Sequence, residues 1–238
     1  DEGAPLAARP RGSRDLDPET STSWPAGFVW SPSANFDLSI DYFDIEMRDQ
    51  VQDLSVDRLL QLEASCRIGT DVNGNPVDPD SPSCVDAVSR ITRLSNGNLY
   101  GIFVNPINVA VERTSGVDLS THYRLPTRIG DFRFSGNYTW TRRHDFQQYT
   151  GDKTIDEFAV NSGFDIPRTK ANASVSWERG AWIATLHGER LGRLPNSDSY
   201  DHVVDTDAGE KAWIGATYLY NASVQYRASD RLQFSLAV

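Results

Sequence analysis

The two cysteines, Cys66 and Cys84, are the residues whose chemistry the sequence constrains most closely. They are separated by residues 67–83, a stretch rich in Gly, Asn, Pro and Asp. In an oxidising compartment two cysteines at this spacing most simply form a disulfide, which would stabilise the closed loop by about 3 kcal/mol in the chain-entropy model. A closed zinc site would need four ligands, and the surrounding segment 49–105 contains no histidine. The spacing therefore predicts a disulfide.

Two short acidic runs superficially resemble cation-binding loops. The run DVNGN at 71–75 begins like a calcium loop, but Pro76 and Pro82 stand at the sixth and twelfth positions, where the EF-hand geometry needs Gly and Glu. The run DTDAGE at 205–210 offers at most a weak cation site. We interpret both runs as solvated loops and expect no metal site in either.

The four histidines do not form a recognisable ligand set, because no two of them lie four residues apart beside a third ligand. His122 and His187 fall on the polar face of alternating segments, and we expect them to line an interior. The sequence contains no phosphate-binding loop, dinucleotide fingerprint, serine-hydrolase elbow or zinc-protease motif. We therefore expect no catalytic site, no resident cofactor or metal, and no enzymatic activity.

Many segments of the chain, including those that carry His122 and His187, alternate between apolar and polar positions with a period of two. This alternation is typical of β-strands with two different faces. The clearest apolar face consists of Phe132, Phe134, Gly136, Tyr138 and Trp140. We predict eight antiparallel strands, at 20–30, 36–48, 106–125, 131–144, 168–178, 182–193, 216–227 and 231–238.

One predicted strand, 36–48, changes phase along its length. Its apolar positions are even-numbered up to Tyr42 and odd-numbered from Phe43 onward. A one-residue slip exchanges the two faces of a strand. The phase change indicates either a bulge near Tyr42–Phe43 or a strand that leaves its first environment there and packs differently.

The connections between the predicted strands alternate strictly between short and long. The short ones are 31–35, 126–130, 179–180 and 228–230, and the long ones are 49–105, 145–167 and 194–215, with 1–19 as the end of another. Within 49–105 we predict two short helices, 55–66 and 86–94. Short turns on one side and long loops on the other are typical of transmembrane β-barrels.

Composition is compatible with such a barrel and excludes other classes. The 238 residues have a mean hydropathy of −0.48 and contain no run of about 20 apolar residues, so no transmembrane helix is expected. A net charge of −10 argues against nucleic acid as a partner. We expect aromatic side chains near strand ends to form the interfacial girdles of a barrel, namely Trp24, Trp30, Tyr42, Tyr123, Trp140, Trp177 and Trp182.

Several short motifs, in order along the chain, resemble those of TonB-dependent receptors. They are LDPETSTS at 16–23 with GFVWSP at 27–32, LSIDYFDI at 38–45, NPIN at 105–108 with SGVDL at 115–119, and LQFSLAV at 232–238. The resemblance covers nearly the whole chain. It implies a barrel of about 22 strands in the bacterial outer membrane, plugged by an N-terminal domain.

The resemblance also implies a function, the active import of a scarce, bulky nutrient such as a ferric siderophore, an oligosaccharide or a cobalamin-like ligand. The implied partners are outer-membrane lipid and lipopolysaccharide, the nutrient, and the TonB complex acting through an N-terminal part. We see neither plug nor TonB box nor a closing last strand, so we expect residues 1–238 to be a partial barrel domain that holds strands 14 to 21 and does not transport alone.

The resemblance makes the long connections extracellular loops and the short ones periplasmic turns. The aromatic and charged residues there that we expect to contact a ligand are Tyr100, Phe103, Arg142, Arg143, His144, Tyr149, Tyr200 and His202. Two alternatives stay open at this point. One is a passive outer-membrane channel, and the other is a soluble β-sandwich that binds carbohydrate.

Overall fold

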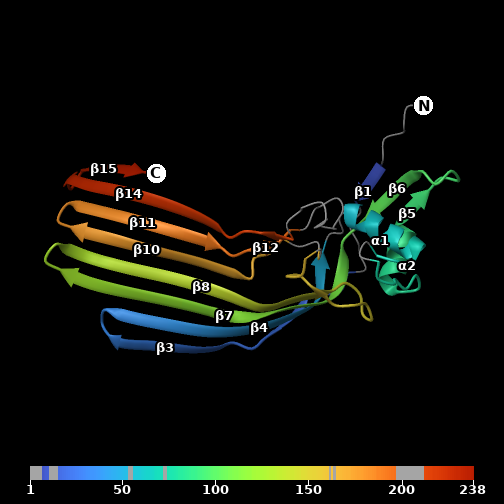
Figure 1. Ribbon diagram of the computed structural model, residues 1–238, viewed down its shortest axis with the longest axis horizontal. Coiled ribbons are helices and arrows are strands. Elements are labelled where there is room, and N and C mark those ends of the chain that lie inside the picture. The colour runs from blue at the N-terminus through green and yellow to red at the C-terminus, as the bar shows by residue number, and fades with distance from the viewer. Residues whose placement is uncertain are drawn as a thin grey trace.

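A single antiparallel sheet dominates the computed structural model, which describes residues 7–10, 16–52, 56–71, 74–160, 162, 165–196 and 212–238 (Figure 1). Neighbouring strands follow in chain order, and β2 and β3 both pair with β4 at one edge. The strands are β2 (Thr20–Ser23), β3 (Ala26–Ser33), β4 (Phe36–Gln52), β7 (Ile107–Thr127), β8 (Gly130–Gln147), β10 (Thr169–Arg179), β11 (Trp182–Leu191), β14 (Thr217–Ser229) and β15 (Leu232–Ala237), with β9 (Ile155–Asp156) beside β8. We call this sheet the wall.

The tight turns of the wall all lie at the same end. Residues 34–35, 128–129, 180–181 and 230–231 connect successive strands, so each hairpin has a two-residue loop. At the other end β4, β7 and β8 continue well beyond their neighbours (Figure 1). The wall is therefore asymmetric along its strands, with tight turns at one end only.

A small module stands on the extended ends of β4, β7 and β8, and we call it the cap (Figure 1). It comprises α1 (Val56–Ile68), α2 (Pro82–Arg90) and a three-stranded sheet of β1 (Ala7–Pro10), β6 (Leu99–Val104) and β5 (Ile91–Arg93). A separate two-stranded ribbon pairs β12 (Leu194–Pro195) with β13 (Trp213–Ile214). The buried apolar cluster joins the cap to the wall ends and consists of Leu59, Ala87, Ile91, Ile102, Ile107, Val109 and Phe146.

The strand register places the apolar and polar positions of the whole wall on opposite faces. One row of cross-strand partners is apolar throughout and runs Phe36, Tyr123, Phe134, Val175, Leu186, Ala222. The adjacent row is polar throughout and runs Asp37, His122, Ser135, Ser174, His187, Asn221. Because side chains alternate along a strand, the period of two carries across the sheet once the register is fixed. The predicted antiparallel segment of about eight strands is confirmed.

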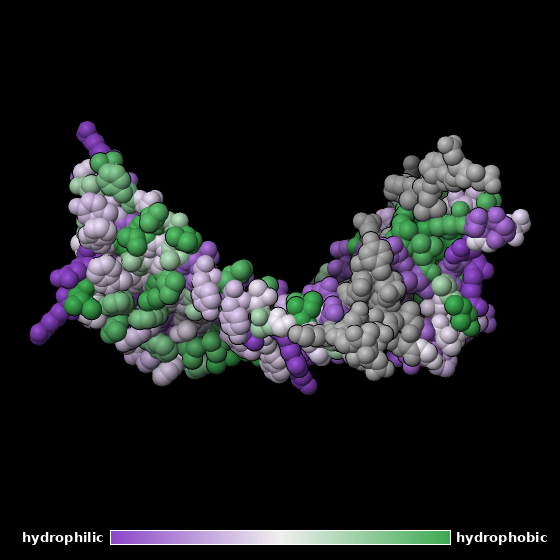
Figure 2. All heavy atoms as spheres, turned by 45° about the horizontal axis from the view of Figure 1, so that its top comes forward, coloured by the Kyte–Doolittle hydropathy of each residue, from purple (hydrophilic) through white to green (hydrophobic). Residues whose placement is uncertain are grey.

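The apolar face of the wall is not covered by a second layer in the part of the chain that the structure describes. Phe134 is 39% exposed, Leu186 50% and Leu236 71%, and apolar side chains gather over the wall in Figure 2. The buried core lies instead under the cap. A soluble β-sandwich would bury this face against another sheet, so the arrangement contradicts that alternative. No helix among the described residues has both the length and the apolar character that crossing a membrane requires.

The phase change in β4 does not come from a bulge in that strand. Its register against β7 is continuous through Tyr42 and Phe43, and the Phe43 ring lies over Gly116 on the inner face. The irregularity lies at the same height in β8, where Arg142 is the extra residue between Thr141 and Arg143. The second interpretation therefore holds: β4 continues unbroken and its apolar side chains pack on the other face.

Two other sequence expectations need correction. The strand expected at 20–30 is interrupted at Trp24 and Pro25, because proline has no N–H for the ladder. The helix expected at 86–94 is α2, Pro82–Arg90, which begins earlier because the Ser81 side chain accepts a hydrogen bond from the Cys84 N–H and proline favours the first helical position. The segment after it becomes β5, since Ile91 takes up extended geometry and pairs with Ile102.

Candidate functional site

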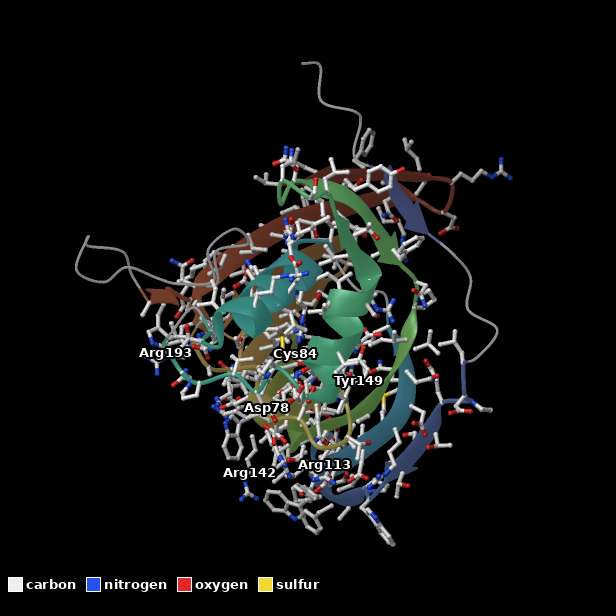
Figure 3. All side chains as sticks on the ribbon, turned by 90° about the vertical axis from the view of Figure 1, so that its right-hand side faces the viewer. Asp78, Cys84, Arg113, Arg142, Tyr149 and Arg193 are labelled. Atoms are coloured by element: carbon white, nitrogen blue, oxygen red, sulfur yellow. A yellow bond between two sulfur atoms is a disulfide. The ribbon has the colours of Figure 1, made fainter. Side chains whose placement is uncertain are left out.

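The disulfide predicted from the sequence is present at the centre of the cap. Cys66 lies near the end of α1 and Cys84 near the start of α2, with their Cα atoms 5.6 Å apart. The two residues are 5% and 0% exposed, respectively. Figure 3, which looks at the cap end-on, shows the bond between the two helices inside the curve of the wall. The bond closes a loop within a small core that packing alone would hold weakly.

A buried ion cluster holds α1 against β5. The Glu63 side chain is 0% exposed and accepts hydrogen bonds from Arg67 Nε at 2.6 Å and Arg93 Nε at 2.8 Å, with a second contact from Arg93. The hydrogen bonds from Arg93 hold the pKa of Glu63 below its usual value, although burial opposes them. Because the carboxylate has two charged donors, its burial is compensated.

Tyr149 fastens the segment after β8 to α2. Its hydroxyl donates to Asp86 Oδ2, and the same oxygen accepts from Arg90 Nε at 2.5 Å. Arg90 Nη1 also donates to Asn105 Oδ1. Burial and the hydrogen bond to Asp86 raise the pKa of Tyr149, so the phenol stays protonated at neutral pH. Tyr149, expected to contact a ligand, thus has its hydroxyl engaged inside the cap.

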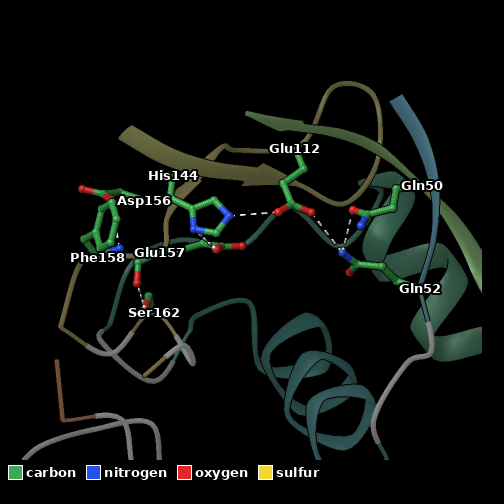
Figure 4. Close-up of polar contacts among 8 residues, drawn as sticks. All are labelled: Gln50, Gln52, Glu112, His144, Asp156, Glu157, Phe158 and Ser162. Carbon is green, nitrogen blue, oxygen red and sulfur yellow. Dashed lines mark hydrogen bonds and ion pairs between the residues drawn. The ribbon is translucent and has the colours of Figure 1, made fainter. Parts of the chain in front are cut away.

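The most concentrated set of chemically versatile side chains consists of Glu112, His144 and Glu157 (Figure 4). His144 Nε2 lies 2.9 Å from Glu112 Oε1, and His144 Nδ1 lies 3.1 Å from Glu157 Oε2. Their side chains are 19%, 20% and 4% exposed for His144, Glu112 and Glu157. Gln52 Nε2 approaches the second oxygen of Glu112 at 3.4 Å and also donates to Gln50 at 3.1 Å.

The bulge in β8 explains why His144 belongs to this set. Tyr138 and Trp140 are on the apolar outer face, and an unbroken alternation would place His144 beside them. The extra residue Arg142 exchanges the faces, so His144 turns inward and is paired with Thr114 of β7. The imidazole therefore meets two carboxylates from other elements beyond the apolar part of the wall.

The electrostatics of this set follow from burial and from mutual hydrogen bonding. The hydrogen bond to Glu112, with the charges of Glu157 and Asp145, raises the pKa of His144. Burial raises the pKa of Glu157 to about 7, and His144 partly opposes that shift. An imidazolium that donates from both nitrogens would satisfy both carboxylates. The arrangement can hold a cation, either a proton or a metal ion, between β7, β8 and the segment after β9.

The remaining residues expected to contact a ligand lie in different places. Tyr100 and Phe103 are on β6 and are 67% and 38% exposed. Arg142 lies at the bulge, where its carbonyl accepts from Arg168 Nη1 at 2.6 Å, and Arg143 is paired with Asp145. Tyr200 and His202 fall outside the described residues.

The aromatic residues expected in girdles sit towards the two ends of the apolar face. Tyr42, Val117 and Trp140 form one row of partners near the cap, and Trp24 lies beyond it in the break between β2 and β3. The others are nearer the tight turns, namely Trp30, Tyr123, Trp177 and Trp182. A shallow hollow on this face is lined by Val117, Leu119, Tyr138 and Trp140 and offers no charged group.

Glu112 and Glu157 are candidate site residues that the sequence did not indicate. Glu112, His144 and Glu157 are spread over three elements, and only strand register and the fold of the 145–167 segment bring them together. No local spacing marks such a set. In the acidic run that begins at Asp71, both Asp71 carboxylate oxygens accept hydrogen bonds from Asn75.

One curved sheet with an uncovered apolar face, a polar opposite face and extensions at one end defines a segment of a transmembrane β-barrel. Residues 2–238 match the family described as TonB dependent receptor-like, beta-barrel. The chain belongs to this TonB-dependent receptor family. Members of the family are outer-membrane β-barrels, which implies that location here.

Solved structures show the same fold at low sequence identity. The ferric enterobactin receptor of Pseudomonas aeruginosa in complex with enterobactin is 16% identical over 95% of this chain and 26% of that one, with a TM-score of 0.57. The FrpB iron transporter from Neisseria meningitidis is 10% identical over 97% and 28%, with a TM-score of 0.54. The siderophore receptor PirA from Acinetobacter baumannii is 14% identical over 96% and 28%, with a TM-score of 0.53.

The chain thus spans about a quarter of the length of these solved structures. Among curated proteins, none shows a significant sequence match.

Proposed function

We propose that this chain forms part of the wall and the surface loops of an outer-membrane receptor that imports a scarce, bulky nutrient with energy relayed by the TonB complex. The cap and the long connections face the cell exterior, and the two-residue turns face the periplasm. The ligand is first captured by the loops, and an energy-dependent rearrangement of a plug then admits it.

The asymmetry of the wall is the observation that carries this proposal. The strands end in two-residue turns at one end, whereas β4, β7 and β8 extend at the other into a disulfide-closed cap. Short periplasmic turns and longer extracellular loops are general features of outer-membrane barrels. A disulfide in the cap also fits an oxidising exterior.

A ferric siderophore is the ligand class that we favour. The similar structures are described as receptors for ferric enterobactin or siderophores and as an iron transporter. The exposed aromatic rings of Tyr100 and Phe103 on β6 would supply flat contact area for such a ligand. Oligosaccharides and cobalamin-like compounds are the alternatives, because the wall itself does not distinguish among these ligands.

Uptake by the complete receptor in outer membranes tests the proposal. Cells expressing it receive a panel of iron-59-labelled siderophores, with and without a functional TonB complex. We expect TonB-dependent uptake of at least one compound and a tenfold or greater loss of its binding in the double variant Y100A/F103A. The variant I68A removes another exposed apolar side chain from the cap and should bind normally.

Two results would contradict the proposal in different ways. Uptake that proceeds equally without the TonB complex would identify a passive channel. In the second test, residues 56–104 are replaced with a short Gly-Ser linker. If TonB-dependent uptake is then unchanged, the cap has no role in ligand capture. Immunodetection of the barrel in outer membranes verifies that each variant is assembled.

A further inference from the structure

We propose that His144 and Glu157 bind a divalent transition-metal ion, with Glu112 positioning the imidazole, at the point where the wall meets the segment 145–167. The ion would be of borderline hardness, and zinc is the probe of choice. This inference is independent of which nutrient the receptor imports.

The donor atoms are already placed at separations that a small metal ion requires. One atom from each of Glu112, His144 and Glu157 lies within 4.8 Å of the others. Two ligands of a tetrahedral zinc ion, each at 2.0–2.1 Å from the metal, stand about 3.3 Å apart. The 3.1 Å between His144 Nδ1 and Glu157 Oε2 is close to that value, so small side-chain movements admit an ion bound to both.

The other imidazole nitrogen of His144, Nε2, faces a carboxylate that would orient the ring for metal binding. Nε2 lies 2.9 Å from Glu112 Oε1, and the second oxygen of Glu112 is approached by Gln52 Nε2. A metal-bound histidine usually donates its remaining N–H to a carboxylate, which fixes the tautomer and the ring orientation. Glu112 occupies that role, and Gln52 in turn restrains Glu112.

The chemistry of the donors selects the class of ion. One imidazole nitrogen and a carboxylate suit zinc, cobalt, nickel or copper better than calcium, which takes six to eight oxygens. Water molecules would complete the coordination. They can reach the ion from the side of His144 and Glu112, whose side chains are 19% and 20% exposed, whereas Glu157 is 4% exposed. Of the nearby cations, the Arg168 guanidinium stacks on Phe158, whereas Arg58 lies over Phe146 and its charge also acts on Glu157.

The consequence for the structure is a cross-link between elements distant in sequence. Glu157 follows β9, and its backbone N–H donates to the His144 carbonyl at 3.0 Å. Glu157 and His144 are therefore already joined through the backbone, and a shared metal ion would join their side chains as well. An ion bound here would fasten the segment 145–167 to β7 and β8. We therefore expect metal to slow the exchange of amides around Ile155–Phe158.

Zinc titration of the complete receptor tests the site. The protein is purified in detergent with a tag that lacks histidine, stripped with EDTA and titrated by calorimetry. We expect one equivalent of zinc, lost in H144N and in E157Q and bound about 10- to 100-fold more weakly in E112Q. Cobalt substitution should give the intense visible bands of a four-coordinate ion. H122N is the matched control, because His122 faces a single carboxylate, Asp37, at 3.0 Å.

The outcomes separate the proposal from its rivals. Failure of the wild-type protein to retain zinc after dialysis would leave only a proton between the carboxylates and overturn the proposal. Zinc binding that survives both H144N and E157Q would place the ion elsewhere and overturn it equally. If H144N does not assemble, the nearly isosteric E157Q variant decides, with heat-modifiable migration on gels as the check of barrel assembly.

Discussion

Breaking the Cys66–Cys84 bond should loosen the cap and leave the wall intact. The bond joins residues 18 apart in sequence, and both cysteines are nearly fully buried. Closing a loop of that size removes chain entropy worth about 3 kcal/mol from the opened cap. Reduction removes no heavy atom, so it creates no cavity comparable to that of a Cys→Ala variant, and the change reports chiefly the lost constraint. At 1.36 kcal/mol per factor of ten, the cap should open roughly 10²-fold more often.

Hydrogen exchange measured by mass spectrometry on the detergent-solubilised receptor gives the increase in cap opening directly. Peptides from α1 and α2 are compared before and after reduction, under conditions in which exchange follows the opening equilibrium. Peptides from β10 and β11 provide an internal reference, since these strands make no contact with the disulfide. Acceleration of less than threefold in the helices would refute the entropic argument. Equal acceleration in β10 and β11 would show that the cap is not an independent unit of stability.

Three further outcomes follow from burial and register. Hydrogen bonds from arginine lower the pKa of Glu63, so acidification below its unfolded value of about 4.5 should progressively lower the protection factors of α1 amides, that is, their exchange corrected for the pH dependence of the intrinsic rate; protection factors that stay constant down to pH 3 would contradict this. Phe134→Arg on the apolar face should lower the free energy of unfolding in lipid by about 2–4 kcal/mol, whereas Ser135→Arg on the polar face should cost far less; equal urea midpoints would count against the two faces. Gly116→Ala should destabilise the barrel by about 1–3 kcal/mol, because its Cβ would lie 2.4 Å from a backbone oxygen, while Gly136→Ala meets nothing nearer than 3.6 Å and should be neutral in the same assay.

Much of the wall could be predicted from the sequence, because a strand with one lipid-facing side shows its environment in every second residue. The alternation at 132–140 is an example, and the structure places those apolar side chains on one face as expected. The ends of the strands are harder to predict from the sequence. β4 and β8 continue to Gln52 and Gln147, beyond the predicted ends at 48 and 144, because the pattern of hydrophobicity changes before the strands end.

The start of α2 was misplaced for a local reason. The apolar residues between 86 and 94 suggested a helix, but the Ser81 cap and Pro82 begin it earlier and pairing with β6 ends it at Arg90. Residues 91–93 are short and ambiguous in pattern. Only the neighbouring strand decides that they are extended.

The sequence by itself determined the antiparallel wall, its two faces, the alternation of short and long connections, and the Cys66–Cys84 bond. These features depend on side-chain period and on spacing along the chain, which are local properties. The meeting of Glu112, His144 and Glu157 was decided by the tertiary structure alone. It depends on strand register and on the single extra residue Arg142, which turns His144 from the apolar face to the polar one. A one-residue shift reverses every later side chain in a strand, and nothing in the local pattern specifies what a reversed side chain will meet.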